Sequence, residues 1–352
     1  MNTVLITGGA GFIGSNFVRY ILNKYPDYFV INLDKLTYAG VLQNLQGLEG
    51  HERHFFIQGD ICDRRLLEEI FSGRYFNEPS VLEKKGADFP KEISIAAVIN
   101  FAAESHVDRS ILDPEIFLKS NVYGTGVLLD VAKTFWQQKD ESFKKSFRYV
   151  QISTDEVYGS LGLNDPAFTE TSPLLPNSPY AAGKAGGDCV VRSYHETYGL
   201  PVLTTRCSNN YGPYQFPEKL IPLMITHILD KKSLPVYGDG KNIRDWIHVS
   251  DHCSGIDAVW HEGRVGEIYN IGGENEWCNI DIVNGLCDTV DDLLKRPRES
   301  RTLIRFVKDR LGHDRRYALG IGKIKEHLGW KPSIGFEQGL KDTVAWYLEH
   351  SS

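Results

Sequence analysis

Residues 3–14 read TVLITGGAGFIG, an apolar, β-branched run that leads directly into glycines at positions 8, 11 and 14. Apolar residues then recur at helical spacing as far as Lys24, so the stretch predicts a strand, a tight turn and a helix. Backbone N–H groups in such a turn can approach a pyrophosphate at the N-terminus of the helix. The same glycines also fit an ordinary turn before a helix, and the next strand helps to decide between the two interpretations.

Residues 28–33 predict the second strand, and Asp34 follows it. A carboxylate about twenty residues beyond the glycine turn can accept both hydroxyls of an adenine ribose and repel a 2′-phosphate. The glycine turn and the acid together therefore predict NAD as the cofactor. Lys35, the next residue, is the opposing signal, because a cation at this place favours NADP.

Strand and helix patterns alternate through the first 208 residues, which predicts an α/β fold with a Rossmann-type doubly wound parallel sheet and helices on both faces. The further strands are expected at 54–58, 95–101, 148–152 and 202–205, and the longer helices at 115–133 and 180–198. Residues 73–90 are charged and aperiodic, which predicts a surface insertion.

From residue 209 the alternation becomes less regular, with helices expected at 218–230, 250–262, 280–295 and 336–349. We therefore expect an NAD-binding domain over residues 1–208 and a smaller mixed α/β substrate-binding lobe over 209–352, with some elements crossing between them.

Composition excludes several classes of protein. No stretch approaches about 18 consecutive apolar residues and no secretory signal precedes the first strand, so we expect a cytoplasmic protein without membrane association. The six cysteines form no CxxC pair and no Cys/His cluster, which predicts reduced thiols and no metal site. The net charge of −7 argues against a nucleic-acid partner, and an anionic substrate would need cations gathered locally.

Candidate catalytic residues follow the strand at 148–152. Thr154 stands at its carboxyl end, where ligands bind in open α/β sheets. Tyr180 and Lys184 lie four residues apart on a predicted helix, so both side chains point the same way. An ammonium and a nicotinamide cation both favour phenolate, so Tyr180 is expected to take a proton from a substrate hydroxyl while hydride leaves. Thr154 would then hydrogen-bond the reacting oxygen.

Asp155 and Glu156 carry further information, because an ordinary reductase or epimerase needs no carboxylates beside that hydroxyl. Buried acids are costly unless they are used, and two neighbouring carboxyls push their pKa values apart. One can then serve as general acid and the other as general base. The alternative is a solvated Asp-Glu turn.

Several segments carry a more specific resemblance: STDEVYG at 153–159, YAAGK at 180–184, NNYGPY at 209–214, FPEKLIP at 216–222, RDW at 244–246 and GHDRRY at 312–317. With the glycine spacing, they resemble the dTDP-glucose 4,6-dehydratase family of extended short-chain dehydrogenases/reductases. The resemblance implies NAD-dependent oxidation of a nucleotide-linked glucose at C4, with Tyr180 as base. Glu156 would then remove the C5 proton while Asp155 protonates the C6 hydroxyl, which leaves as water. Hydride return to C6 would give the 4-keto-6-deoxy sugar.

The resemblance also implies the ligand contacts. For the cofactor these are Gly8, Gly11, Phe12, Ile13, Gly14, Asp34, Lys35, Leu36, Thr37, Asp60, Ile61, Ala102, Ala103, Ser105, Ser120, Tyr180, Lys184 and Asn210. For the nucleotide sugar they are Ser105, Ser153, Thr154, Asn209, Lys219, Leu220, Pro235, Val236, Tyr237, Arg244, Asn279, Arg310, His313 and Tyr317. It implies a homodimer joined through helices 115–133 and 180–198.

Two departures from the family pattern stand out: Gly183 and its alanine neighbours replace expected serines, and Leu311 replaces an expected proline. The choice between dTDP and UDP stays open. So do two alternatives, a dehydratase or 4-epimerase acting on UDP-sugars or other nucleotide sugars, and a catalytically silent NAD-binding scaffold.

Overall fold

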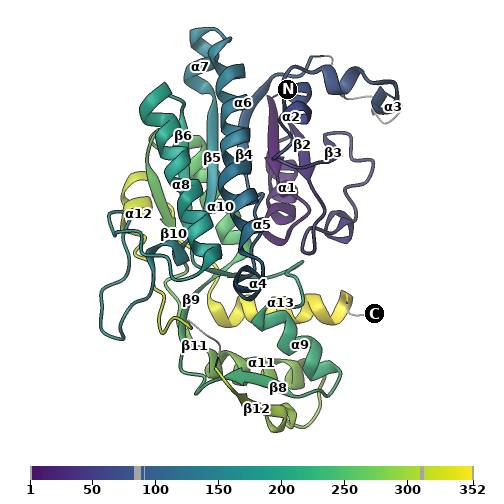
Figure 1. The fold of residues 1–352 in the computed structure, drawn as a ribbon. Coiled ribbons are helices and arrows are strands. Elements are labelled where there is room, and N and C mark those ends of the chain that lie inside the picture. The colour runs from purple at the N-terminus through teal and green to yellow at the C-terminus, as the bar shows by residue number, and fades with distance from the viewer. Residues whose placement is uncertain (1, 83–88, 91, 310–312, 351–352) are drawn as a thin grey trace.

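The computed structural model describes residues 2–82, 89–90, 92–309 and 313–350. Its main sheet has seven strands in the order β10-β6-β5-β4-β1-β2-β3 (Figure 1), and every neighbouring pair is parallel. The strands are β1 (Asn2–Thr7), β2 (Tyr28–Asp34), β3 (His54–Gln58), β4 (Ile95–Asn100), β5 (Arg148–Thr154), β6 (Val202–Cys207) and β10 (Ile268–Ile271). The predicted Rossmann-type doubly wound sheet is confirmed.

Successive residues of each strand face opposite helix layers, which is why the strands are apolar throughout. In β1, Val4 and Ile6 lie in the hydrophobic cluster beside α1 (Phe12–Lys24) and α10 (Val249–Glu262). Leu5 lies in the opposite cluster, beside α2 (Arg64–Phe71), α6 (Thr125–Gln137) and α8 (Pro179–Tyr198). Full burial of each such side chain contributes about 1.5–3 kcal/mol.

The helix expected at 115–133 is interrupted. It consists of α5 (Pro114–Leu118), a π-helical segment (Lys119–Gly124) and α6. The amide group of Asn121 bonds both backbone groups of Glu104, accepting from its N–H at 2.9 Å and donating to its carbonyl at 3.0 Å. A wide helical turn thus anchors the loop after β4, and such turns often mark functional sites. Helix α8 packs beside it and runs unbroken through Gly183.

The smaller lobe lies at the bottom of Figure 1, beneath the lower edge of the main sheet, and has its own hydrophobic core. It contains a three-stranded sheet in the order β11-β9-β7 and a parallel pair of β12 and β8. Its strands are β7 (Asn209–Tyr211), β8 (Leu234–Tyr237), β9 (Ile243–His248), β11 (Glu276–Cys278) and β12 (Ile304–Val307), and its helices are α9 (Leu220–Leu229), α11 (Asn279–Leu293) and α13 (Phe336–His350).

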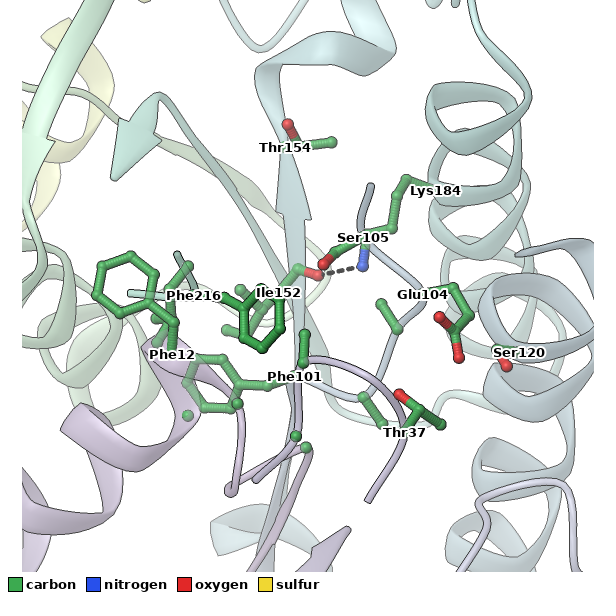
Figure 2. A pocket seen from close by; sticks show the side chains of 18 of the residues that line it. Phe12, Thr37, Phe101, Glu104, Ser105, Ser120, Ile152, Thr154, Lys184 and Phe216 are labelled. Atoms are coloured by element: carbon green, nitrogen blue, oxygen red, sulfur yellow. Dashed lines mark hydrogen bonds between the residues drawn. The ribbon is translucent and has the colours of Figure 1, made fainter. Parts of the chain in front are cut away.

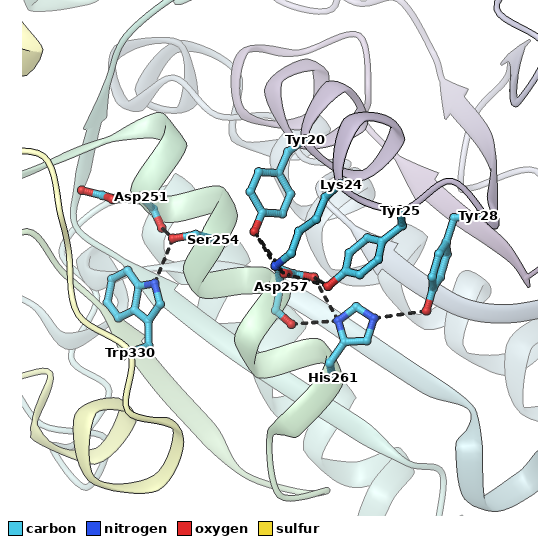
Figure 3. Close-up of polar contacts among 9 residues, drawn as sticks. All are labelled: Tyr20, Lys24, Tyr25, Tyr28, Asp251, Ser254, Asp257, His261 and Trp330. Carbon is cyan, nitrogen blue, oxygen red and sulfur yellow. Dashed lines mark hydrogen bonds and ion pairs between the residues drawn. The ribbon is translucent and has the colours of Figure 1, made fainter.

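Parts of the second half of the chain nevertheless complete the main sheet. Strand β10 pairs with β6, and Figure 3 shows how α10 is fastened to α1. The buried carboxylate of Asp257 accepts hydrogen bonds from Lys24 Nζ at 2.5 Å and from the hydroxyl of Tyr25 at 3.0 Å. Trp330, after α12 (Gly322–Leu328), donates to Ser254 Oγ at 2.9 Å. The two predicted units are therefore interleaved along the chain.

The segment expected as a surface insertion is partly packed. Residues 73–82 form a 3-10 turn (Arg74–Asn77) and α3 (Pro79–Leu82), and Phe76 and Val81 are buried in the main core. The ring of Phe76 meets that of Phe55 in β3 at 5.6 Å between centroids. These two side chains are the buried exceptions in a stretch that is otherwise exposed or half-buried over residues 73–82, as expected of a surface insertion. Residues 83–88 of the segment lie outside the described residues.

The remaining short helices are α4 (Val107–Leu112), α7 (Glu141–Ser146) and 3-10 turns at Leu42–Leu45, Asp155–Tyr158 and Ser300–Leu303. Among the described residues, no helix combines the length and apolar character needed to cross a membrane.

Candidate active site

The glycine turn after β1 is closely packed against the loop after β4. Gly8 has a φ of +73°, and a Cβ atom there would lie 2.6 Å from the backbone nitrogen of Ala102. A Cβ atom on Gly14 would lie 2.2 Å from the carbonyl oxygen of Gly8. Only glycine fits at these two positions, and the first turn of α1 consequently opens toward the space beyond the sheet.

That space is a cavity of about 310 Å³ at the carboxyl ends of the strands. Its lining includes every predicted cofactor residue except Leu36: Gly8, Gly11, Phe12, Ile13, Gly14, Asp34, Lys35, Thr37, Asp60, Ile61, Ala102, Ala103, Ser105, Ser120, Tyr180, Lys184 and Asn210. From the predicted substrate set it includes Ser105, Ser153, Thr154, Asn209 and Lys219. The structure thus brings residues from six strand ends and from the smaller lobe to one site.

Asp34 is bonded within the turn itself. Its two carboxylate oxygens accept hydrogen bonds from the backbone N–H groups of Ala10 at 2.9 Å and Leu36 at 2.8 Å. Burial raises the pKa of Asp34 above its ordinary value, and these amides oppose the rise. Each oxygen has a second lone pair, so capacity to bind ribose hydroxyls is left.

Leu36 is the predicted cofactor residue that does not line the cavity, and its assignment as a cofactor contact stays a prediction. Its φ of 57° turns the chain at this point, and its side chain packs against the hydrophobic cluster beside α1. Its contribution is the N–H group that holds Asp34.

The hydroxyl and acid that follow β5 are joined by short contacts. Thr154 Oγ1 donates to Asp155 Oδ1 at 3.2 Å and accepts from the backbone N–H of Glu156 at 3.3 Å. Asp155 is only 2% exposed, and its Oδ2 atom has no hydrogen-bond partner within the described part of the chain. Glu156 is half-buried. The predicted pair of acids therefore faces the protein interior rather than bulk solvent.

Lys184 is held beneath this cluster. Its Nζ donates to the carbonyl oxygen of Ile152 at 2.6 Å, and Figure 2 shows this bond crossing from α8 to β5, with Thr154 farther along the same strand. Tyr180, one helical turn earlier, is buried, and its ring meets the edge of Phe117 at 6.3 Å. Contacts within the protein itself thus fix the phenol of Tyr180, the ammonium of Lys184 and the hydroxyl of Thr154.

Burial dominates the electrostatics. It raises the pKa of Asp155 well above its ordinary range, with further increases from the nearby Glu156 and Asp245 carboxylates. Burial and then Glu156 likewise raise the pKa of Tyr180, while burial lowers the pKa of Lys184. The expectation that Lys184 lowers the pKa of Tyr180 is therefore not met by these side chains alone. For Asp155, in contrast, burial and the neighbouring carboxylates raise the pKa, which is the direction that a general acid needs.

Sequence reasoning missed two buried acids at this site. Glu104 lines the cavity, and burial raises its pKa, opposed by the positive charge of Lys35. Asp245 accepts from the N–H groups of Gly273 at 3.0 Å and Asn275 at 2.7 Å, and burial raises its pKa to about 6. Asp245 lies within the RDW segment at 244–246, and Glu104 follows the predicted cofactor contacts Ala102 and Ala103, so an acid beside a functional segment was the available signal.

Apart from Arg310, which the described residues do not include, the other predicted substrate residues lie in the smaller lobe and do not line this cavity. Arg244 is buried, donates to the carbonyl oxygen of Asp314 at 2.9 Å and lies 4.5 Å from the ring centroid of Tyr317. Asn279 Oδ1 is buried without a hydrogen-bond partner in the described residues. The ring of Tyr237 lies 6.3 Å from that of His313.

Val236 is buried in the lobe core and Leu220 packs against it, and both stay predicted substrate contacts. Pro235 precedes Val236 in β8. Arg310 lies outside the described residues.

Comparison with known proteins shows the family. A family model described as GDP-mannose 4,6 dehydratase matches residues 5–78 and 88–343 and passes over part of the predicted insertion. A dTDP-glucose 4,6-dehydratase of Xanthomonas campestris pv. campestris (strain B100) is 50% identical over 356 residues, covering 100% of this chain and 95% of that protein.

Solved structures agree with this comparison. A dTDP-glucose 4,6-dehydratase from Streptomyces venezuelae, with NAD and dTDP bound, is 47% identical with a TM-score of 0.85, covering 99% of this chain and 97% of that chain. A UDP-glucose 4-epimerase from Thermotoga maritima, solved with UDP-glucose, is 26% identical with a TM-score of 0.81, covering 99% of this chain and 100% of that chain. The chain therefore belongs to the GDP-mannose 4,6 dehydratase family and is similar over its whole length to dTDP-glucose 4,6-dehydratases.

Proposed function

We propose that this protein is an NAD-dependent dTDP-glucose 4,6-dehydratase, a hydro-lyase. The observation that carries the proposal is the buried acid Asp155 beside Thr154, in a cavity that also contains Tyr180, Lys184 and the glycine turn. A dehydrogenase or an epimerase of this fold needs the phenol and the turn, but it has no use for a protonated carboxyl group. Loss of water from a sugar requires such a group.

The residues present fit NAD. The close approach at Gly8 and Gly14 leaves backbone groups rather than side chains at the N-terminus of α1, which suits a pyrophosphate. Asp34 can bind ribose hydroxyls. Lys35 forms an ion pair with Asp60 at 2.8 Å, and this pairing reduces the attraction of the Lys35 charge for a 2′-phosphate. When bound, NAD⁺ supplies a hydride acceptor and a positive charge that favours the Tyr180 phenolate.

The protein's own groups supply the proton transfers. Tyr180 takes the proton from the C4 hydroxyl while Thr154 holds that oxygen, and the C4–H bond breaks to leave a ketone. The ketone acidifies the C5 hydrogen, which Glu156 removes as a proton. Asp155 gives its proton to the C6 hydroxyl, the C6–O bond breaks, and water leaves. After the hydride returns to C6 and a proton returns to C5, the product is the 4-keto-6-deoxy sugar.

The smaller lobe would hold the nucleotide diphosphate. Lys219, Arg244 and Arg310 bring positive charge to a chain whose net charge is −7. The unpartnered Asn279 oxygen and the stacked Tyr317 are suited to polar and aromatic parts of a nucleotide. We assign residues 1–208 to cofactor binding and 209–352 to substrate binding, with β10, α10 and α12 contributing to the first unit's fold.

We also propose a homodimer joined through α5, α6 and α8. Supporting this, Leu118 and Tyr123 on the α5–α6 face and Tyr198 on α8 are exposed apolar side chains, at 49%, 59% and 44%. Exposed apolar faces of this kind mark association surfaces. The protein is assigned to the cytoplasm on its six free cysteines. Light scattering of the purified protein measures the oligomeric state, and a monomer would contradict the proposed dimer.

Incubation with dTDP-glucose and with UDP-glucose tests the proposed activity. A dehydratase yields a 4-keto product that absorbs in alkali. A 4-epimerase yields dTDP-galactose without that absorbance, and a silent scaffold yields no product. A faster reaction with UDP-glucose would transfer the assignment to the UDP-sugar enzymes.

A further inference from the structure

Four side chains from three separate segments meet at one side of the cavity. The guanidinium of Arg109, in α4, lies 3.7 Å from the ring centroid of Tyr38, in the loop after β2. Arg109 Nε also lies 3.7 Å from the carboxylate of Glu218, which follows β7 in the smaller lobe. Tyr38 meets Phe216 of the same lobe segment edge-on, at 5.7 Å between ring centroids. Arg109 therefore connects segments from both halves of the chain.

The lobe segment, residues 212–219, is fastened to the main sheet at further points, and we call it the strap. Lys219 Nζ donates to the carbonyl oxygen of Ser105 at 3.2 Å. Asn16 Nδ2, in α1, donates to the carbonyl oxygen of Pro213 at 3.0 Å. Arg19, also in α1, lies over the ring of Tyr214 at 4.2 Å. The strap thus runs from the smaller lobe across to the dinucleotide-binding turn.

Both partners of Arg109 form the cavity wall. Tyr38, Phe216, Glu218 and Lys219 line the cavity, as Figure 2 shows for Phe216, whereas Arg109 itself does not. Arg109 therefore touches the wall from outside. Separation of the strap from the Tyr38 loop would break at least one of these two contacts of Arg109, the ring contact or the ion pair.

We propose that Arg109 is a positioning residue that clamps the strap to the Tyr38 loop and thereby slows release of the bound NAD. The inference rests on the proposed function, in which each turnover regenerates NAD⁺, so the cofactor does not need to dissociate between turnovers. An arginine suits this role because its planar guanidinium can stack on a ring and pair with a carboxylate at the same time. A lysine at this position would keep the charge and lose the stacking geometry.

The test measures the rate at which NAD leaves the purified holoenzyme, with the released NAD trapped by an excess of an NAD-consuming enzyme. Arg109→Gln should release NAD about tenfold faster than wild type, given the size of exposed cation–π and ion-pair contributions. Arg109→Lys should recover only part of that difference. Turnover at saturating NAD should stay near the wild-type value.

Arg64→Gln is the matched control. The side chain of Arg64 is 50% exposed, as is that of Arg109, and it pairs with Asp130 at 2.8 Å; neither Arg64 nor Asp130 lines the cavity. Its NAD release should match wild type. Tyr38→Leu removes the ring without touching Arg109 and should accelerate release, whereas Tyr38→Phe should not.

The outcomes separate the clamp from the activity. Wild-type release rates in Arg109→Gln, in protein that folds and carries NAD, would overturn the clamp and leave the proposed function intact. A wild-type protein that binds no NAD would overturn the proposed function, and the clamp with it. If Arg109→Gln fails to fold, the two Tyr38 variants provide the test. Equal rates of NAD release from Tyr38→Leu and Tyr38→Phe would reject the clamp.

Discussion

Replacement of Asp155 by asparagine tests the assignment of the general acid. Asparagine keeps the shape of the side chain and can accept the hydrogen bond from Thr154 Oγ1, which is 3.2 Å long in the wild type. It cannot give a proton to the leaving hydroxyl. A general acid contributes about 10²- to 10⁴-fold, so turnover should fall by that factor, which raises the barrier by about 3–5 kcal/mol. Oxidation at C4 and proton exchange at C5 depend on other groups and should persist.

Asp155→Asn should also change how the stability of the folded protein depends on pH. Burial raises the pKa of Asp155 in the folded protein, whereas the unfolded chain has a pKa of about 3.9. Between these values the folded state binds more protons, so its stability falls as pH rises, by up to about 1.4 kcal/mol per pH unit. The stabilising contribution of the protonated Asp155 carboxyl group is fully present below about pH 4. It is lost as the pH rises toward the raised pKa. Asparagine removes this loss, so Asp155→Asn should melt above wild type at pH 8 and near it at pH 4.

Three measurements follow from one preparation: product formation, NADH absorbance on mixing with dTDP-glucose, and melting temperature at several pH values. Asp165→Asn, in an exposed turn, is the control and should behave as wild type in all three. Wild-type rates of water loss in Asp155→Asn would refute the assignment. A melting difference that grows toward low pH would refute the inferred direction of the Asp155 pKa shift.

Three further predictions concern other parts of the site. Glu156→Gln should still reduce NAD on mixing with substrate but should not exchange the C5 hydrogen with D₂O; exchange at the wild-type rate would remove Glu156 from its role. Gly14→Ala places a Cβ atom 2.2 Å from Gly8 O, so the purified variant should carry little NAD. Full occupancy by NAD would contradict the assignment of the glycine turn to cofactor binding. Arg244→Lys should raise KM for dTDP-glucose about tenfold with kcat within a fewfold of wild type, because it removes ground-state binding; steady-state kinetics with the KM unchanged would place the diphosphate elsewhere.

Local sequence patterns were sufficient for six of the seven strands of the main sheet and for bringing the candidate catalytic residues together, whereas β10 was not predicted. Parallel strands are buried on both faces, so residues 28–33 read as a continuous apolar run and could be assigned without the structure. The spacing of Tyr180 and Lys184 needs only the helical repeat. The family motifs then related these features to one cavity.

Other features depend on contacts between distant residues and carry no local pattern. The π-helical segment at Lys119–Gly124 occurs together with two hydrogen bonds between Asn121 and Glu104. The helical repeat of the sequence cannot reveal these bonds. The buried Phe76 depends on the sheet edge that receives it. The high pKa of Tyr180 reflects burial beside Glu156, whereas sequence reasoning considered only the two cations, Lys184 and the nicotinamide ring.

In the proposed reaction, one site oxidises C4, expels the C6 hydroxyl and returns the same hydride to C6. Conversion of dTDP-glucose that carries deuterium at C4, in ordinary water, shows whether this happens. We expect deuterium in the methyl group of the 4-keto-6-deoxy product, as detected by NMR. A sugar that keeps its C6 hydroxyl and its deuterium at C4 would rule out the proposed reaction.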